Sequence, residues 1–158
     1  MRIALYEPDI PQNAGTILRL AACLGLEAHI VGPAGFPVGD RAFRRAGMDY
    51  LDKVSIVRHP GWTDFEAWRK ETLRRGDGAR LILFTTRGTA SYLDHAYRAG
   101  DVLLFGRESA GVPDHVHAAA DARLTIPMRE GLRSLNVAMA AAMAVGEALR
   151  QTQGWPDR

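Results

Sequence analysis

Residues 101–111 read DVLLFGRESAG and place an apolar strand directly before a polar loop that has a glycine at each end. The run DVLLF at 101–105 and the run RLILFT at 80–85 are typical of strands that are buried on both faces. Such strands belong to parallel sheets with helices on both sides. Because ligands usually bind beyond the carboxyl ends of these strands, we expect a functional site at the loop GRESAG, residues 106–111.

Strand and helix patterns alternate along the rest of the chain. This alternation predicts an α/β fold in which a mostly parallel sheet has helices on both faces. The 158 residues contain no repeat or linker, so we expect a single domain over 1–158. Besides the two strong runs, the predicted elements are strands at 2–6, 28–31, 53–57 and 123–126, helices at 13–25, 63–74 and about 134–150, and a short basic helix that begins at Asp40.

Composition narrows the possible functions. The chain carries 20 basic and 18 acidic side chains, so RNA binding would depend on where the arginines lie and not on bulk charge. The single cysteine, Cys23, cannot form an internal disulfide, and we expect it to be a small core residue. His115 and His117 stand two positions apart, and with no cysteine pair the sequence predicts no metal site. We find no secretory signal or membrane-spanning stretch and expect a cytoplasmic protein without a membrane partner.

The first polar cluster follows the strand at 2–6 and reads EPDIPQNAGTILR at 7–19. Asn13 suits the N-cap of the next helix. Arg19 follows Thr16 by three residues, so the two side chains can share a helix face. The cluster indicates either an ordinary capped helix with a solvated arginine or one side of a binding site.

The second cluster is the loop GRESAG itself, which is not a dinucleotide-binding fingerprint. Glu108 stands where that motif needs its second glycine, and its carboxylate would repel a pyrophosphate. Two alternatives are a plain tight turn and a site for a ligand with cationic or hydroxyl groups near Glu108.

The third cluster, IPMREGLRSLNVAMAAAM at 126–143, ends a strand and starts the last helix. Ser134 fits the N-cap of that helix, and Asn136 falls in its first turn. The helix carries a stripe of small residues that allows close packing, either against the sheet or against another subunit. The stripe consists of Ala138, Ala142 and Gly146.

The three clusters together resemble the SPOUT class of methyltransferases. The order Asn13-x-Gly15…Arg19, then Gly106-x-Glu108-x-x-Gly111, then Ser134-x-Asn136 is similar to the branch that methylates ribose 2′-oxygens. Further stretches resemble one group in that branch, the minimal enzymes that methylate the wobble nucleotide, cytidine or uridine 34, of leucine tRNAs. These stretches are YEPDIPQNAGTILRL at 6–20, RRAGMDY at 44–50, TTRGT at 85–89 and LTIPM at 124–128.

The resemblance implies properties that the patterns themselves do not establish. It implies S-adenosylmethionine as cofactor and a deep trefoil knot around residues 80–140, with the last helix threaded through it. It also implies a homodimer with active sites at the interface and a tRNA anticodon stem-loop as partner. Carried over by position, the cofactor-binding residues are Phe84, Thr85, Gly106, Glu108, Gly111, Ile126, Met128, Ser134 and Leu135.

The same resemblance implies the catalytic residues Arg19, Asn13, Glu108 and Asn136, with Ser134 beside them around the reacting ribose. Arg19 would then act as the base, although a neutral guanidine at pH 7 costs about 9 kcal/mol. The alternative is that Arg19 stays charged, binds the neighbouring phosphate and stabilises the developing alkoxide.

RNA contact is expected from residues 41–58, where five basic side chains stand against two acidic ones. We expect Arg41, Arg44 and Arg45 to contact phosphates and Tyr50 to stack on a base. The alternative is an ordinary solvated helix face. Two other functions stay open, namely ribose methylation at another position of tRNA or ribosomal RNA, and a non-catalytic RNA-binding knot protein.

Overall fold

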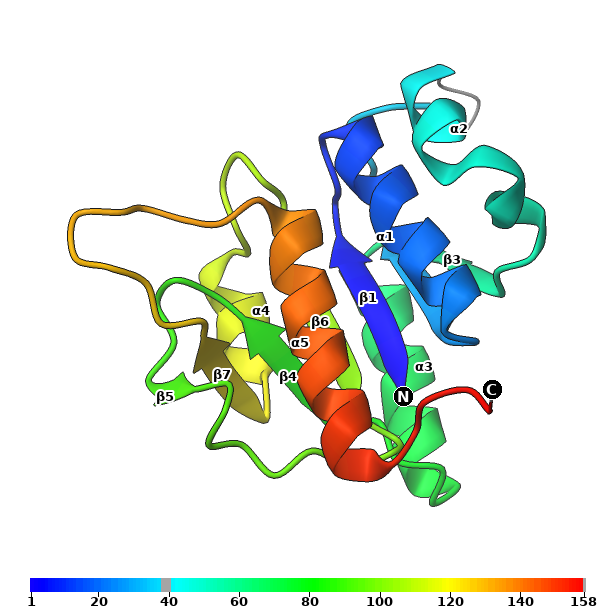
Figure 1. Cartoon of the computed structure of the whole chain (residues 1–158). Helices are drawn as coiled ribbons and strands as arrows, with labels where there is room; N and C mark the ends of the chain where they lie inside the picture. Colours follow the sequence, from blue (N-terminus) through cyan, green and yellow to red (C-terminus); the bar gives the residue numbers. More distant parts are fainter. Residues whose placement is uncertain (38–40, 158) are drawn as a thin grey trace.

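The computed structural model describes residues 1–37 and 41–157 and arranges seven strands of these residues in one sheet. Their order is β3-β2-β1-β6-β4-β7-β5, and each neighbouring pair is parallel. This arrangement confirms the predicted α/β fold with a parallel sheet (Figure 1). The strands are β1 (Arg2–Tyr6), β2 (Glu27–Val31), β3 (Ile56–His59), β4 (Leu81–Phe84), β5 (Ala90–Ser91), β6 (Val102–Phe105) and β7 (Ala122–Thr125).

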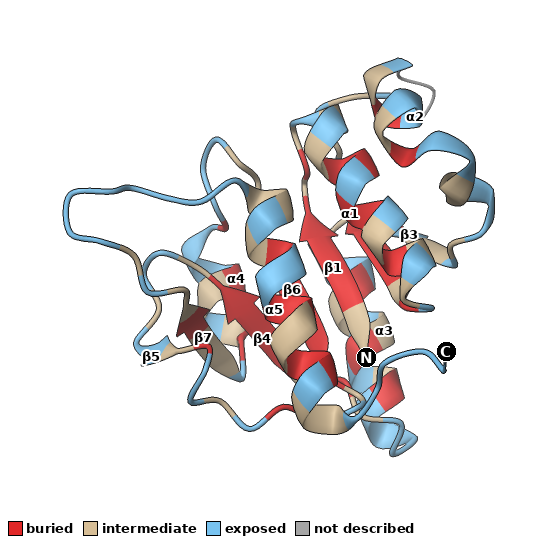
Figure 2. Ribbon diagram, viewed as in Figure 1, coloured by how far each residue is buried: buried red, intermediate tan, exposed pale blue. Residues whose placement is uncertain are grey.

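Helices cover both faces of the sheet, as the sequence predicts. The helices are α1 (Pro11–Cys23), α2 (Arg41–Gly47), the 3-10 helix η1 (Met48–Asp52), α3 (Trp62–Arg74), α4 (Asp114–Ala119) and α5 (Val137–Thr152). Leu103 and Phe105 of β6 pack in the core with α1 and α5, whereas Val102 and Leu104 pack on the opposite face with α3 and α4. Figure 2 shows that the central strands of the sheet are mostly buried between these helices, whereas β7 near the edge is only partly buried. Within the described residues, no helix is long and apolar enough to cross a membrane.

Several element boundaries differ from the predicted ones. The strand predicted at 53–57 is β3, Ile56–His59, because η1 ends at Asp52 and residues 53–54 form a turn and bend after it. The last helix begins at Val137 and not at Ser134, and β5, η1 and α4 were not expected from the sequence. The expected helix start at Asp40 lies outside the described residues. Cys23 is exposed near the end of α1, so the prediction of a core cysteine is wrong.

The strand register places several loops side by side at one edge of the sheet. Phe105 of β6 is level with Leu5 of β1 and with Phe84 of β4, and Phe84 is level with Leu124 of β7. Because these strands run in parallel, their carboxyl ends lie next to one another. The loops that follow β1, β4, β6 and β7 therefore meet, although they are far apart in the sequence.

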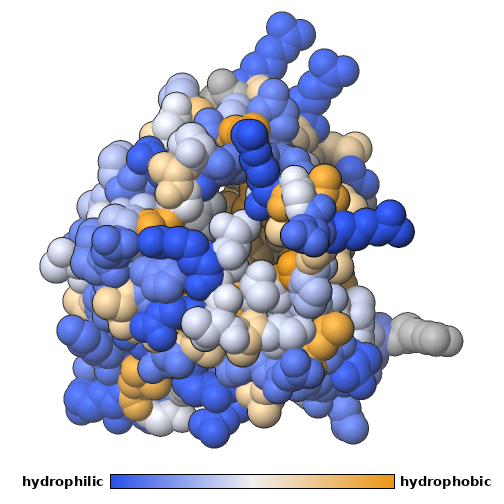
Figure 3. Space-filling view, turned by 90° about the vertical axis from the view of Figure 1, so that its left-hand side faces the viewer, coloured by the Kyte–Doolittle hydropathy of each residue, from blue (hydrophilic) through white to orange (hydrophobic). Residues whose placement is uncertain are grey.

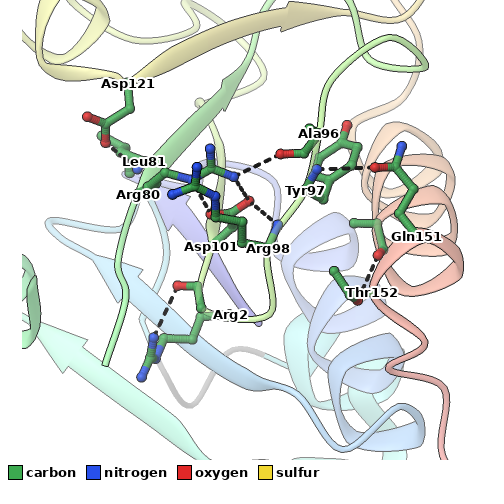
Figure 4. A network of polar contacts seen from close by, with 12 residues as sticks. Arg2, Arg80, Leu81, Ala96, Tyr97, Arg98, Asp101, Asp121, Gln151 and Thr152 are labelled. Carbon is green, nitrogen blue, oxygen red and sulfur yellow. Dashed lines mark hydrogen bonds and ion pairs between the residues drawn. The ribbon is translucent and has the colours of Figure 1, made fainter. Parts of the chain in front are cut away.

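A buried ion pair organises the opposite end of the sheet (Figure 4). Asp101, directly before β6, is 1% exposed and accepts hydrogen bonds from Arg80 Nε and Nη2, both at 2.8 Å. The backbone N–H of Arg98 also donates to Asp101, at 2.8 Å. The backbone N–H of Tyr97 donates to Gln151 Oε1 of α5 at 3.1 Å. A buried carboxylate requires such partners, and the bonds to Asp101 hold the β4–β6 connection together. The bond from Tyr97 to Gln151 links this connection to the end of α5.

Candidate cofactor and substrate site

A cavity of about 530 Å³ lies at the carboxyl ends of β4, β6 and β7. The loops 106–111 and 126–136 border it, and Figure 3 shows a hollow with both hydrophilic and hydrophobic residues around it. Asn13 and Asn136 also line the cavity. The cavity brings together all nine residues that were expected to bind the cofactor, namely Phe84, Thr85, Gly106, Glu108, Gly111, Ile126, Met128, Ser134 and Leu135.

The loop 106–111 closes on itself through its own backbone. The N–H of Arg107 donates to the carbonyl oxygen of Gly111 at 3.1 Å, and the N–H of Gly111 donates to the carbonyl oxygen of Arg107 at 2.8 Å. Gly111 has a φ of +66°, and a Cβ on Gly106 would lie 2.7 Å from the Gly111 carbonyl carbon. Both ends of the loop therefore require glycine, and the tight turn holds Glu108 at the cavity.

A chain of hydrogen bonds joins the three polar clusters. The Asn13 amide group donates to Glu108 Oε1 at 3.2 Å, and the Asn136 amide group donates to Asn13 Oδ1 at 2.9 Å. Asn136 Oδ1 in turn accepts from the backbone N–H groups of Ala138 and Met139 at 2.9 and 3.3 Å. The chain Glu108–Asn13–Asn136 thus runs from the loop after β6, through the first turn of α1, to the start of α5.

The structure corrects two helix caps that the sequence predicts. Asn136 is the N-cap of α5, whereas Ser134 lies two residues earlier in the exposed loop and lines the cavity. Asn13 does not cap α1, because that helix starts at Pro11 with Ile10 as its N-cap residue. Helix α5 starts later, and helix α1 starts earlier, than the sequence pattern suggests. The Asn13 amide group therefore does not cap α1 and instead forms hydrogen bonds with the other two clusters.

The Glu108 carboxyl group is paired with a second carboxyl group, that of Asp9. Burial and hydrogen bonding with Asp9 raise the pKa of Glu108 above its ordinary value. Hydrogen bonding with Glu108 and Ser109 lowers the pKa of Asp9 to about 2. Asp9 is therefore ionised at neutral pH, and Glu108 binds a proton more readily than an exposed glutamate does.

Arg19 does not join this polar chain within the single subunit. It stands six residues after Asn13 on α1, which places it about 9 Å along the helix and about 120° around it. Its guanidinium lies 5.1 Å from the centre of the Tyr50 ring and donates to the Met48 sulfur at 3.2 Å. Asn13, Glu108 and Asn136 are therefore brought together, while Arg19 faces η1.

Of the expected RNA-binding residues, Tyr50 contacts Arg19, and the three arginines lie on α2, which packs against α1. Arg41, Arg44 and Arg45 are exposed on α2, and Arg41 and Arg45 line a surface groove together with Gln12. Tyr50 is half-buried, and Lys53 lies 5.5 Å from its ring centre, so cations already contact the ring that was expected to stack on a base.

Gly15 explains how this basic surface comes so close to the polar chain. A Cβ at Gly15 would lie 2.6 Å from the Phe43 carbonyl oxygen, so glycine is needed for α2 to pack against α1. One helix thus presents Asn13 to the cavity and supports α2 two residues later.

Asp9 is the polar residue at this site that the sequence reasoning missed. It lies within the first polar cluster, but no helix cap or known spacing singles it out. Its pairing with Glu108 depends on β1 and β6 being neighbours in the sheet. Among the residues that the structure describes, no group of three or more His, Cys, Asp or Glu side chains is placed to hold a metal ion.

The cap assignment can be tested by comparing two alanine variants. Asn136→Ala removes the N-cap of α5 and should lower the free energy of unfolding by about 1 kcal/mol, whereas Ser134→Ala should change it by less than about 0.5 kcal/mol. Urea unfolding followed by circular dichroism gives both values. An equal loss of stability in both variants would contradict this assignment.

The chain was compared with known families and proteins. It matches the SpoU rRNA Methylase family over residues 1–146. A tRNA (cytidine(34)-2′-O)-methyltransferase of Ancylobacter novellus is 62% identical over 155 residues, which cover 98% of this chain and 95% of that protein. Among solved structures, one from work on 2′-OH methylation of C/U34 on tRNA has a TM-score of 0.89 and 41% identity, covering 97% of this chain and 96% of the other.

A third relative bears on the cofactor. The SpoU methyltransferase AviRb from Streptomyces viridochromogenes, solved with the cofactor AdoMet, has a TM-score of 0.89 and 28% identity. The match covers 96% of this chain and 57% of AviRb. S-adenosylmethionine is thus the cofactor of this family. Family match, sequence identity and fold agree, and the chain belongs to the SpoU methylase family.

Proposed function

We propose that this chain transfers a methyl group from S-adenosylmethionine to the ribose 2′-oxygen of nucleotide 34, the wobble nucleotide, in leucine tRNAs. The observation that carries this proposal is the single cavity that all nine expected cofactor-binding residues line, bordered by the chain Glu108–Asn13–Asn136. The name of the Ancylobacter relative supports cytidine 34 as the target.

The cavity suits this cofactor in size and in chemistry. Its volume of about 530 Å³ lies within the range of small-molecule sites. S-adenosylmethionine supplies a methyl group on a cationic sulfur, which transfers without a metal. The paired carboxyl groups of Glu108 and Asp9 place negative charge beside the cavity, and backbone groups of loops 106–111 and 126–136 can recognise the adenine edge.

The chain's own residues would then position the ribose. Asn13 and Asn136 hold each other in fixed orientations, and each retains polar atoms at the cavity. Such fixed groups would align the ribose hydroxyl with the methyl group, which is the main requirement of an in-line transfer. Glu108 would hold the same ribose from the loop after β6.

A homodimer would complete this site. Arg19 is turned away from the cavity of its own subunit, so a second copy would have to supply the arginine that the transfer requires. The outer face of α5 carries exposed apolar side chains, with Met139 61% and Met143 41% exposed. Of the small residues, Ala142 is exposed and a Cβ at Gly146 would meet open space, which favours a subunit contact there, whereas Ala138 packs partly against the core.

The RNA would approach along the basic surface of α2. Arg41, Arg44 and Arg45 would bind the phosphates of the anticodon stem-loop, and a charged Arg19 beside them would bind the phosphate next to the reacting ribose. Deprotonating a guanidinium at neutral pH costs free energy, and this cost favours the phosphate-binding role of Arg19 over the base role. We place the protein in the cytoplasm, where tRNA is modified.

We also propose that residues 1–158 form one domain with a trefoil knot in its C-terminal part. β6 lies between β1 and β4, whereas β7 lies beyond β4. The chain then returns from β7 to α5, which packs against α1 and β6 near the middle of the sheet. This return path supports threading of α5 through the segment around residues 80–140.

The proposed activity can be tested on leucine tRNA from cells that lack this protein. The purified chain and S-adenosylmethionine should add one methyl group to the ribose of nucleotide 34, detected by mass spectrometry of ribonuclease fragments and nucleosides. Heat-inactivated protein is the control. Absence of ribose methylation would refute the activity, and methylation confined to fragments without nucleotide 34 would support the alternative of another RNA position.

The dimeric site predicts complementation between two inactive variants. Arg19→Ala and Glu108→Gln should each abolish methylation. When the two proteins are mixed and allowed to exchange subunits, half of the dimers are mixed and hold one intact site of two, so about one quarter of the wild-type activity should return. Each variant alone is the control. No recovery, with mixed dimers shown to form, would mean that Arg19 acts within its own subunit or not at all.

A further inference from the structure

Asp9, in the loop between β1 and α1, binds the loop 106–111 at several points. Its Oδ1 accepts from the backbone N–H of Glu108 at 3.0 Å, and its own backbone N–H donates to Glu108 Oε2 at 3.3 Å. The Ser109 hydroxyl donates to Asp9 Oδ2. One residue thus binds both the backbone and the carboxyl group of Glu108.

The other oxygen of the Glu108 carboxyl group is held from the same direction. Glu108 Oε1 accepts from the Asn13 amide group at 3.2 Å, and Asn13 follows Asp9 by four residues. Glu108 lines the cavity, whereas Asp9 is not among the described residues that line it. Asp9 therefore contacts the site only through Glu108 and Ser109.

We propose that Asp9 is a positioning residue, which fixes the Glu108 carboxyl group at the cavity for methyl transfer. This inference rests on the proposed function, because it treats Glu108 as part of the reacting site. Asp9 acts in two ways. Its hydrogen bonds hold the loop 106–111 against the start of α1, and its hydrogen bonding adds to the effect of burial in raising the pKa of Glu108.

The surroundings of Glu108 support the second effect. Asp9 faces it from the loop after β1 and is ionised at neutral pH, because its pKa is lowered to about 2. The neighbouring charges Glu7 and Arg107 form an ion pair at 3.5 Å and largely offset each other. Asn13 of α1 is uncharged, and Asn136 at the start of α5 bonds to Asn13. Burial is thus the first cause that raises the pKa of Glu108, and hydrogen bonding with Asp9 is the second.

The test uses Asp9→Asn, which keeps an acceptor oxygen for the Glu108 N–H but removes the charge. In the full-length protein, kcat for tRNA methylation should fall at least about tenfold, while the Kd for S-adenosylmethionine stays within about threefold. The pKa of Glu108, measured by NMR with carboxyl-labelled glutamate, should also fall. Ser109→Ala, which leaves the charge in place, should reduce kcat less. Asp114→Asn, which removes an exposed carboxylate paired with Arg87, is the matched control and should behave as wild type.

Three results would overturn the proposal. The first is an Asp9→Asn variant with wild-type kcat and an unchanged Glu108 pKa. The second is a loss of thermal stability and cofactor binding in proportion to kcat, which would show a merely structural role. The third is a wild-type protein that does not methylate tRNA, and this result would overturn the proposed function as well. An active wild type with an unaffected Asp9→Asn variant would overturn only this inference.

Discussion

The hydrogen bonds from Asn13 to Glu108 and from Asn136 to Asn13 hold together three segments, of which the first lies 95 residues before Glu108 and 123 residues before Asn136. They can form only because β1 and β6 are neighbours in a parallel sheet, and because α5 returns to the middle of that sheet. Everything else at the site depends on this constraint. The turn 106–111 presents Glu108, Asn136 starts α5, and the cavity lies between the loops that these side chains connect.

The helix α1 links this polar chain to the basic surface. Asn13 reaches the cavity from the first turn of α1, Gly15 allows α2 to pack closely, and Arg19 contacts η1 from the opposite side. A displacement of α1 would therefore move a cavity residue and the arginine-bearing surface together. This connection gives a physical reason for the spacing of Asn13, Gly15 and Arg19, since each uses a different face of one rigid element.

Much of the fold could be predicted from the sequence, because buried parallel strands such as LILF at 81–84 have few alternative interpretations. The strand pattern predicted that the site would lie at the loop after β6, whereas the individual cavity-lining residues were expected only from the resemblance to SPOUT methyltransferases. The details that failed depend on tertiary contacts. Ser134 and Asn136 are both good N-cap residues, and the hydrogen bonds from the backbone N–H groups of Ala138 and Met139 show that Asn136 starts α5. Asp9 was missed because its partner Glu108 lies in a distant part of the sequence. Helix spacing separates Arg19 from Asn13, but its contacts with Met48 and Tyr50 depend on the packing of η1 against α1.

The central claim is that Asn13 and Asn136 act as one unit at the cofactor cavity. A double-mutant cycle tests it directly, with Asn13→Ala, Asn136→Ala and the double variant titrated with S-adenosylmethionine by calorimetry. We expect the effects on binding free energy to be non-additive by more than about 0.5 kcal/mol, because either substitution breaks the same chain. Additive effects within about 0.3 kcal/mol would contradict this account and show that the two side chains bind the cofactor independently.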